Sequence, residues 1–312
     1  AALGTAAVAA LSTAALAGLG TADIAALNDA AVAALTSGQL AALTSGQIGA
    51  LEIDDLGRLS TAAMAGFGAT QVAGLSTAQI VALGAARIGQ LGTAAIAALS
   101  TGQIAALSTA QAGAISGGAA RGFSAAQVAA FTTGQIAALS TAAVAALGTA
   151  ALAGLASEDI VALTTAQAAR LTSAQIGALT TAQLTAFETE DLAQIAPSSL
   201  QALGSAQLAA LSTRQVAALS TGAIGALSTA ALKGLGTEDI VALTTAQAAR
   251  LSAAQIAALG TAQIAALETA DIAQLSVSAM AGFGTALMPS LGTAQIRALS
   301  TAQIAALSSA AI

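Results

Sequence analysis

The fold is decided by one octapeptide, which reads Leu99-Ser100-Thr101-Gly102-Gln103-Ile104-Ala105-Ala106 and starts again at Leu107. In steps of eight from Leu3 to Leu307, all 39 positions hold Leu, Ile or Phe, without an insertion or a deletion. A second row of mostly large apolar residues lies five residues after the first. A fixed short period of this kind indicates a solenoid, in which each repeat buries its apolar face against its neighbours.

The octad predicts one short α-helix per repeat and no sheet. In a continuous helix, eight residues advance about 80° beyond two full turns, so the Leu row would spiral around the axis. In a strand, a spacing of five residues would put the two apolar rows on opposite faces. Alanine also favours helices over strands. We therefore expect an all-α solenoid of 39 helices, each about six residues long, running as a single domain over residues 1–312.

The polar residues of the octad predict where each helix begins. Ser100 is placed as the N-cap and Gln103 as the third helical residue (N3), which together form a capping box. Ser, Thr, Asn or Gly occupies the N-cap position in 34 of the 39 octads, and Gln or Asp occupies N3 in 24. We expect both large apolar rows to lie inside the solenoid, with Thr, Ala and Gln outside. The number of octads in each superhelical turn does not follow from this pattern.

Some parts of the array depart from the pattern. We expect irregular structure at Gly113 to Gly122, Ala196 to Ser199 and Leu287 to Ser290. The terminal octads, Ala1 to Thr5 and Leu307 to Ile312, resemble interior repeats, although solenoids usually end in polar capping repeats. We therefore expect either a longer array or copies that stack end to end.

Composition argues against several classes of function. Charged residues make up 7% of the chain, against about 25% in typical domains. The eight Lys and Arg residues are scattered, so they cannot form the basic stripe that nucleic-acid binding requires. The longest stretch without a polar residue, Ala62 to Ala69, is eight residues, whereas a membrane-spanning helix needs about 20. We expect no nucleic-acid partner and no transmembrane segment.

The acidic residues are the clustered charges of the chain, and each cluster starts a predicted helix. Carboxylates at a helix start complement the helix dipole, and this is the interpretation we favour. Calcium binding is the alternative, although no dedicated calcium loop is present. The clusters are Glu52-Ile53-Asp54-Asp55, Glu158-Asp159, Glu188-Thr189-Glu190-Asp191, Glu238-Asp239 and Glu268-Thr269-Ala270-Asp271.

The basic residues and nucleophiles do not form a catalytic constellation. Arg58, Arg170 and Arg250 precede the Leu row near acidic octads, and we expect each to form a salt bridge between successive turns. The chain has no His and no Cys, and Lys233 is its one lysine, so Ser and Thr lack a general base. We expect no enzyme activity, no catalytic or cofactor-binding residues, no metal ligands and no cofactor.

A row of Thr or Ser occupies the first helical position (N1) in 30 of the 39 octads, including Thr93, Thr101 and Thr109. The simplest interpretation is a small polar residue that tolerates a helix start. Two alternatives stay open: a regular Thr/Ala lattice that binds ice or another surface, and a scaffold that binds ligands along one groove.

Segments such as Leu163-Thr164-Thr165-Ala166-Gln167 and Leu259-Gly260-Thr261-Ala262-Gln263 resemble the LTTAQIAAL-type repeat tracts of large secreted or cell-surface proteobacterial proteins. That resemblance implies a fibre, stalk, surface-layer or adhesin-spacer segment outside a bacterial cell, with further copies or flanking repeats as its partners. The Leu-Thr-x-x-Gln segment also resembles the first helix of transcription activator-like effector repeats. The 34-residue period and the base-reading loop of those repeats are missing here, so DNA binding is not expected.

Overall fold

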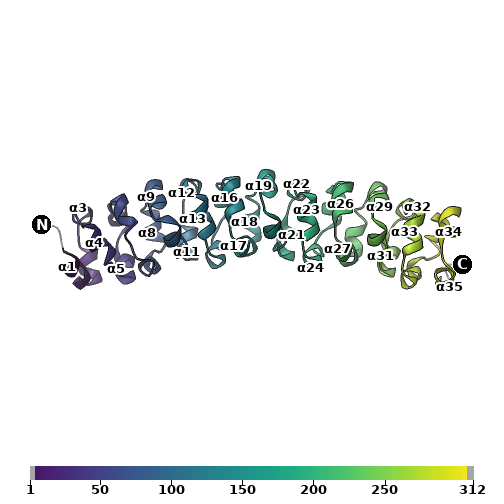
Figure 1. Cartoon of the computed structure of the whole chain (residues 1–312), viewed down its shortest axis with the longest axis horizontal. Helices are drawn as coiled ribbons and strands as arrows, with labels where there is room; N and C mark the ends of the chain where they lie inside the picture. The colour runs from purple at the N-terminus through teal and green to yellow at the C-terminus, as the bar shows by residue number, and fades with distance from the viewer. Residues whose placement is uncertain (1–3, 308–312) are drawn as a thin grey trace. The chain divides into compact units, whose positions relative to one another are not determined.

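The computed structural model describes residues 4–307, and each octad in that range contains one short helix (Figure 1). The described part holds 35 α-helices and three 3₁₀ helices, and no strand. The helices are three to six residues long, which is too short for stability in isolation. The predicted fold class, an all-α array of one short helix per octapeptide, is confirmed. The expected character of the first three and last five residues lies outside the described range.

The chain divides into two compact units, and the boundary falls between Leu163 and Thr164. The helices of unit 1 are Thr5–Ala10 (α1), Thr13–Ala17 (α2), Thr21–Ala25 (α3), Asp29–Ala33 (α4), Ser37–Ala42 (α5), Ser45–Gly49 (α6), Ile53–Leu56 (α7), Ala63–Gly66 (η1), Ala69–Ala73 (α8), Thr77–Ala82 (α9), Gly84–Ile88 (α10), Thr93–Ala97 (α11), Thr101–Ala106 (α12), Thr109–Ala114 (α13), Gly117–Ala120 (α14), Ala125–Val128 (α15), Thr133–Ala138 (α16), Thr141–Ala146 (α17), Thr149–Leu152 (α18) and Ser157–Val161 (α19).

Unit 2 continues the same pattern. Its helices are Thr165–Ala168 (α20), Ser173–Ala178 (α21), Thr181–Thr185 (α22), Thr189–Gln194 (α23), Pro197–Leu200 (α24), Ser205–Ala210 (α25), Thr213–Ala218 (α26), Thr221–Ala226 (α27), Thr229–Leu232 (α28), Thr237–Ala242 (α29), Thr245–Ala248 (α30), Ala253–Ala258 (α31), Thr261–Ala266 (α32), Thr269–Gln274 (α33), Val277–Gly282 (η2), Met288–Ser290 (η3), Thr293–Ala298 (α34) and Thr301–Ala306 (α35).

Each superhelical turn contains three octads, or 24 residues. In unit 1, α9 contacts α12 and α13 contacts α16, so each of these helices packs on the helix three places further along. In unit 2, α26 contacts α29 in the same way. The three helices of one turn therefore stack on the three helices of the next.

The two large apolar rows form the core, as predicted. The second row is 0–1% exposed from Val8 to Met280, and the Leu row is also buried from Leu27 to Leu299. All five Phe residues replace a member of the Leu row and are buried. The rings of Phe123 and Phe131 meet edge to face, with centroids 5.2 Å apart.

The N3 glutamines are buried, except for the half-buried Gln207, so their expected position on the outside is wrong. Gln103 is 4% exposed. Its Oε1 accepts the backbone N–H of Ser100 at 2.8 Å, which completes the predicted capping box. Its Nε2 donates to the carbonyls of Val72 and Leu75, in the preceding turn, at 3.0 and 2.7 Å. One side chain therefore caps its own helix and also joins two turns.

This inter-turn bond recurs along both units. Each of these glutamines donates from Nε2 to the carbonyl of a residue 28 positions earlier or 30–31 positions earlier, and most reach both. The glutamines are Gln39, Gln47, Gln71, Gln79, Gln103, Gln111, Gln127 and Gln135 in unit 1, and Gln207, Gln215, Gln247, Gln255, Gln263, Gln295 and Gln303 in unit 2.

Two other residue types reach the same acceptors from N3. Arg87 donates to the carbonyls of Leu59 and Gly57. Ser199 donates from its hydroxyl to the carbonyl of Leu171 at 2.7 Å. Because these donors differ in shape but share their acceptors, the fixed feature of the junction is a side-chain donor that satisfies the end of the preceding helix.

Small residues before the Leu row allow neighbouring turns to approach closely, as expected. A Cβ added at Gly154 would lie 2.0 Å from the carbonyl oxygen of Ala125 in the preceding turn. Gly66 and Gly282 make the same kind of approach, and both end a 3₁₀ helix (η1 and η2) that the sequence did not predict.

Of the three segments expected to be irregular, Leu287 to Ser290 is confirmed because it forms the 3₁₀ helix η3. The expectation is wrong for the other two, which form the regular helices α14 and α24. Pro197 is accommodated because it lies at N1, where no backbone N–H is needed.

Candidate functional site

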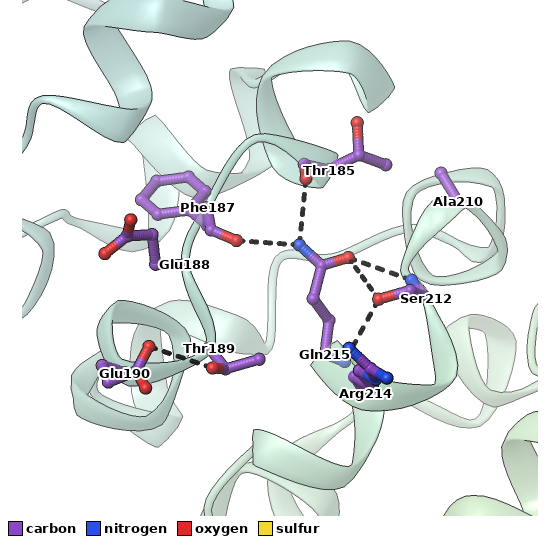
Figure 2. A pocket seen from close by; sticks show the side chains of 9 residues that line it. All are labelled: Thr185, Phe187, Glu188, Thr189, Glu190, Ala210, Ser212, Arg214 and Gln215. Atoms are coloured by element: carbon purple, nitrogen blue, oxygen red, sulfur yellow. Dashed lines mark hydrogen bonds between the residues drawn. The ribbon is translucent and has the colours of Figure 1, made fainter.

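A hollow of about 680 Å³ lies on the surface of unit 2, between the beginnings of α23 and α26 (Figure 2). It is open to solvent. Its lining residues are Thr185, Phe187, Glu188, Thr189, Glu190, Ala210, Ser212, Arg214 and Gln215.

The repeat places these residues in register. Glu188 is the N-cap residue of α23 and Ser212 is the N-cap residue of α26, one turn of 24 residues later. Glu190 and Arg214 are therefore equivalent, each at the second position (N2) of its helix, and both are exposed. No ion pair within 4.0 Å joins the two side chains in the described structure.

Gln215 forms the floor of the hollow and is committed to structural bonds (Figure 2). Its Nε2 donates to the carbonyls of Phe187 and Thr185, at 2.9 and 3.1 Å. Its Oε1 accepts hydrogen bonds from the backbone N–H and the hydroxyl of Ser212, each at 3.0 Å. The groups that remain for a ligand are therefore those on the rim.

The rim carries a stable negative charge at Glu190. Hydrogen bonding from its own backbone N–H, followed by the hydroxyl of Thr189, lowers the pKa of the Glu190 carboxyl. The Thr189 hydroxyl donates to Oε2 of Glu190 at 3.0 Å. The hollow thus offers one guanidinium, that of Arg214, and the exposed carboxylates of Glu188 and Glu190, which suit polar or charged contacts.

The predicted acidic clusters do begin helices, and the N3 aspartates of two of them act as helix caps, as does Asp23 outside the clusters. Asp159 and Asp239 accept the backbone N–H of Ala156 and Gly236 at 2.9 and 2.8 Å. Asp23 does the same with Gly20. In each of these octads the N-cap residue has no side-chain oxygen, so the aspartate supplies the local acceptor.

The octads with Glu at the N-cap behave differently. In one of these octads, Asp271 at N3 hydrogen-bonds to the hydroxyl of Thr245 in the preceding turn, and burial raises the pKa of Asp271. Its Oδ2 is buried without a hydrogen-bond partner. Asp55, after Glu52, lies within hydrogen-bond reach of the Asp29 carboxyl in the preceding turn. The sequence prediction, which assigned all these carboxylates to dipole complementation, missed this contact between turns.

No group of three or more His, Cys, Asp or Glu side chains among residues 4–307 is arranged to hold a metal ion. The predicted salt bridge of Arg58 is present, because its Nε lies 3.4 Å from Oδ2 of Asp29 in the preceding turn. The corresponding predictions for Arg170 and Arg250 are wrong, since neither forms an ion pair within 4.0 Å in the described part of the chain. Lys233 ends α28 as its C-cap.

The Thr row lies at the solvent-facing start of each helix, and several of its methyl groups also face the next turn. A Cβ at Gly102 would lie 4.0 Å from Cγ2 of Thr77, and one at Gly134 would lie 3.7 Å from Cγ2 of Thr109. Thr93 also donates from its hydroxyl to the carbonyl of Gly118 at 3.0 Å. The row therefore contributes to the junction between turns. None of the described helices has the length and apolar character that crossing a bilayer requires.

Comparison with known proteins identifies the repeat. The model of a family described as "ALTTAQ repeat" matches most of the chain in ten segments, several of which overlap. These are residues 16–53, 48–85, 86–117, 128–165, 152–187, 184–221, 221–253, 237–269, 249–277 and 280–312. No curated protein matches the chain.

Among solved structures, the chain is similar to a leucine-rich repeat-containing protein, LegL7, from Legionella pneumophila. The two are 14% identical, and the match covers 70% of this chain and 78% of that protein. The TM-score is 0.20, which is too low to assign a common fold.

Proposed function

Because this chain belongs to the ALTTAQ repeat family, we propose that it is a structural protein, built to span distance as a stalk, fibre or surface-layer segment outside a bacterial cell. The observation that carries the proposal is the repeated junction between turns. The same buried donor-to-carbonyl bond joins consecutive turns along each unit, from Gln39 in unit 1 to Gln303 in unit 2.

Such a junction suits a load-bearing element. Many of these bonds, such as those of Gln103, are buried among apolar residues, where water does not compete for the donor and the acceptor. Each turn meets its neighbour through the same two apolar rows. A chain of this kind is extended by adding equal turns, and its stability is a sum over turns and the interfaces between them.

Single-molecule stretching tests the mechanical part of the proposal. We expect the chain to unfold in steps whose contour gain is a multiple of one turn, about 80 Å for 24 residues. Replacing Gln103 with Leu should lower the force of the steps that open its junction. The same change at the exposed Gln90, which is not at N3, is the matched control. Extension without resolvable steps and without measurable resistance would contradict a load-bearing role.

Electron microscopy and cell labelling test assembly and location. We expect the purified chain to form filaments or regular contacts between copies, and antibodies against it to label intact bacterial cells that produce it. Monomeric particles that produce thermal hysteresis would instead favour the ice-binding alternative. Label found only after cell lysis would argue against a position outside the cell.

A further inference from the structure

One contact between turns of unit 1 joins two carboxyl groups. Asp55 is at N3 of α7, and its side chain is 3% exposed. Its carboxyl lies within hydrogen-bond reach of the carboxyl of Asp29, the first residue of α4. Helices α4 and α7 are stacked helices of consecutive turns. In other octads, a glutamine at this N3 position joins the two turns.

The charges around this contact are unequal. The Nε atom of Arg58 lies 3.4 Å from Oδ2 of Asp29, and both of these side chains are exposed. Arg58 is not within ion-pair distance of Asp55. Glu52 and Asp54, in the same octad as Asp55, add negative charge beside it. Helix α9 packs on α7 from the other side and contains no charged residue. Asp29 therefore has a cation beside it, whereas Asp55 is buried next to further carboxylates.

Two ionised carboxylates are both acceptors and cannot hydrogen-bond to each other. With one proton between them, they form a charge-assisted O–H···O⁻ bond. We propose that Asp55 is a proton-operated clasp: in its acid form it donates to the Asp29 carboxylate and fastens the two turns, and when it ionises the same two residues repel. The bond that forms is Asp55 O–H to Asp29, and Arg58 holds the acceptor in place.

An equivalent position in unit 2 shows what the clasp depends on. Asp271 occupies the same register in α33, after Glu268, but the residue that it reaches in the preceding turn is Thr245. The threonine hydroxyl is itself a donor, so this contact requires no added proton. The presence of Asp29 in place of a threonine makes the Asp55 contact sensitive to pH.

The direction of the effect follows from the same surroundings. Burial first, and then the charge of Asp29, raise the pKa of Asp55 above its usual range. A carboxyl whose pKa is higher in the folded state than in the unfolded state stabilises the fold at low pH, and that contribution is lost as pH rises through the folded pKa. The junction between α4 and α7 should therefore tighten on acidification.

Carboxyl ¹³C NMR of the full chain tests the pairing directly. We expect Asp55 to titrate above the usual aspartate value. Asp29→Asn should lower the pKa of Asp55, because the new amide donates to the carboxylate. Asp54→Asn, which removes one exposed charge from the same octad, is the control and should lower it less. An Asp55 titration unchanged by Asp29→Asn would show that burial alone sets it and would overturn the clasp.

Hydrogen exchange tests the consequence for the fold. Protection of the α4 and α7 amides, corrected for intrinsic exchange, should fall as pH rises through the titration of Asp55. In Asp55→Asn the side-chain amide is a permanent donor, so protection should no longer depend on pH in this range. If the protection of these amides in the wild-type chain does not depend on pH, the proposal is contradicted. Recovery of protection on adding Ca²⁺ at neutral pH would point to a bridging cation instead of a proton.

Discussion

The side-chain amide of Gln103 donates a 2.7 Å hydrogen bond to the carbonyl of Leu75, 28 residues earlier in the chain. The same amide group accepts the N–H of Ser100 through its oxygen. A capping box by itself requires an acceptor at N3, which Glu would supply as well as Gln. Yet no octad has Glu at N3, whereas 18 have Gln. The requirement for a donor toward the preceding turn explains this choice.

Replacing Gln103 with Glu should be strongly destabilising. The change keeps the acceptor for Ser100 but points a carboxylate oxygen at the carbonyls of Val72 and Leu75. Leaving such buried polar groups unpaired costs about 1–3 kcal/mol, and more for a charged group. Denaturant unfolding at neutral pH measures the loss. Gln90→Glu, at an exposed position, should change stability by less than about 0.5 kcal/mol. Equal effects at the two positions would contradict the assigned role of Gln103.

Replacing Gly154 with Ala should force two turns apart. The added Cβ would lie 2.0 Å from the carbonyl oxygen of Ala125, so the backbone must move. Overpacking of this kind costs about 1–3 kcal/mol. Gly148→Ala is the matched control, because nothing lies within 4 Å of a Cβ there.

The comparison is read from the denaturation midpoints of the two variants. Gly148 has an ordinary extended conformation with φ −64°, so alanine fits there without backbone strain. We expect the midpoint to fall markedly for Gly154→Ala and only slightly for Gly148→Ala. If Gly154→Ala keeps the wild-type midpoint, the close approach of the turns is not needed for stability.

Neutralising Asp271 should stabilise the chain at neutral pH. Burial is the largest cause that raises the pKa of this carboxyl, and Glu268 adds to it. The neutral form therefore favours the folded state at low pH, and this contribution disappears as pH rises through the raised pKa. Asp271→Asn should increase the unfolding midpoint near neutral pH and have little effect below the usual aspartate pKa of about 3.9. If Asp271→Asn raises the unfolding midpoint more at acidic pH than at neutral pH, the expected pH dependence is wrong.

The edge-to-face contact of Phe123 and Phe131 should contribute beyond its buried area. Leu occupies the same row in most octads, so Phe→Leu at either position preserves the core pattern. A double-mutant cycle of Phe123→Leu and Phe131→Leu should give a coupling free energy of about 0.5–1.5 kcal/mol. Additive effects of the two changes would mean that the rings act independently and that the 5.2 Å contact adds nothing specific.

The local structure of each octad follows from the sequence pattern alone. Ser100 and Gln103 are three residues apart, so the helix start that they form depends only on the backbone between them. The Leu row and the second apolar row identify the core because each short helix has one face to bury. Phe67 and the other aromatic residues were recognised as interior from their place in the row.

The way in which the octads close into turns depends on tertiary packing. Stacking three octads per turn brings Gln103 to Leu75, and it brings Asp55 to Asp29. The angle between successive short helices sets which residues meet, and the pattern within one octad does not encode that angle. The burial of Gln103, the hollow beside Arg214 and the paired carboxyls therefore could not be derived from the repeat. They depend on contacts between residues about 24 to 31 positions apart, which exist only once the turns are stacked.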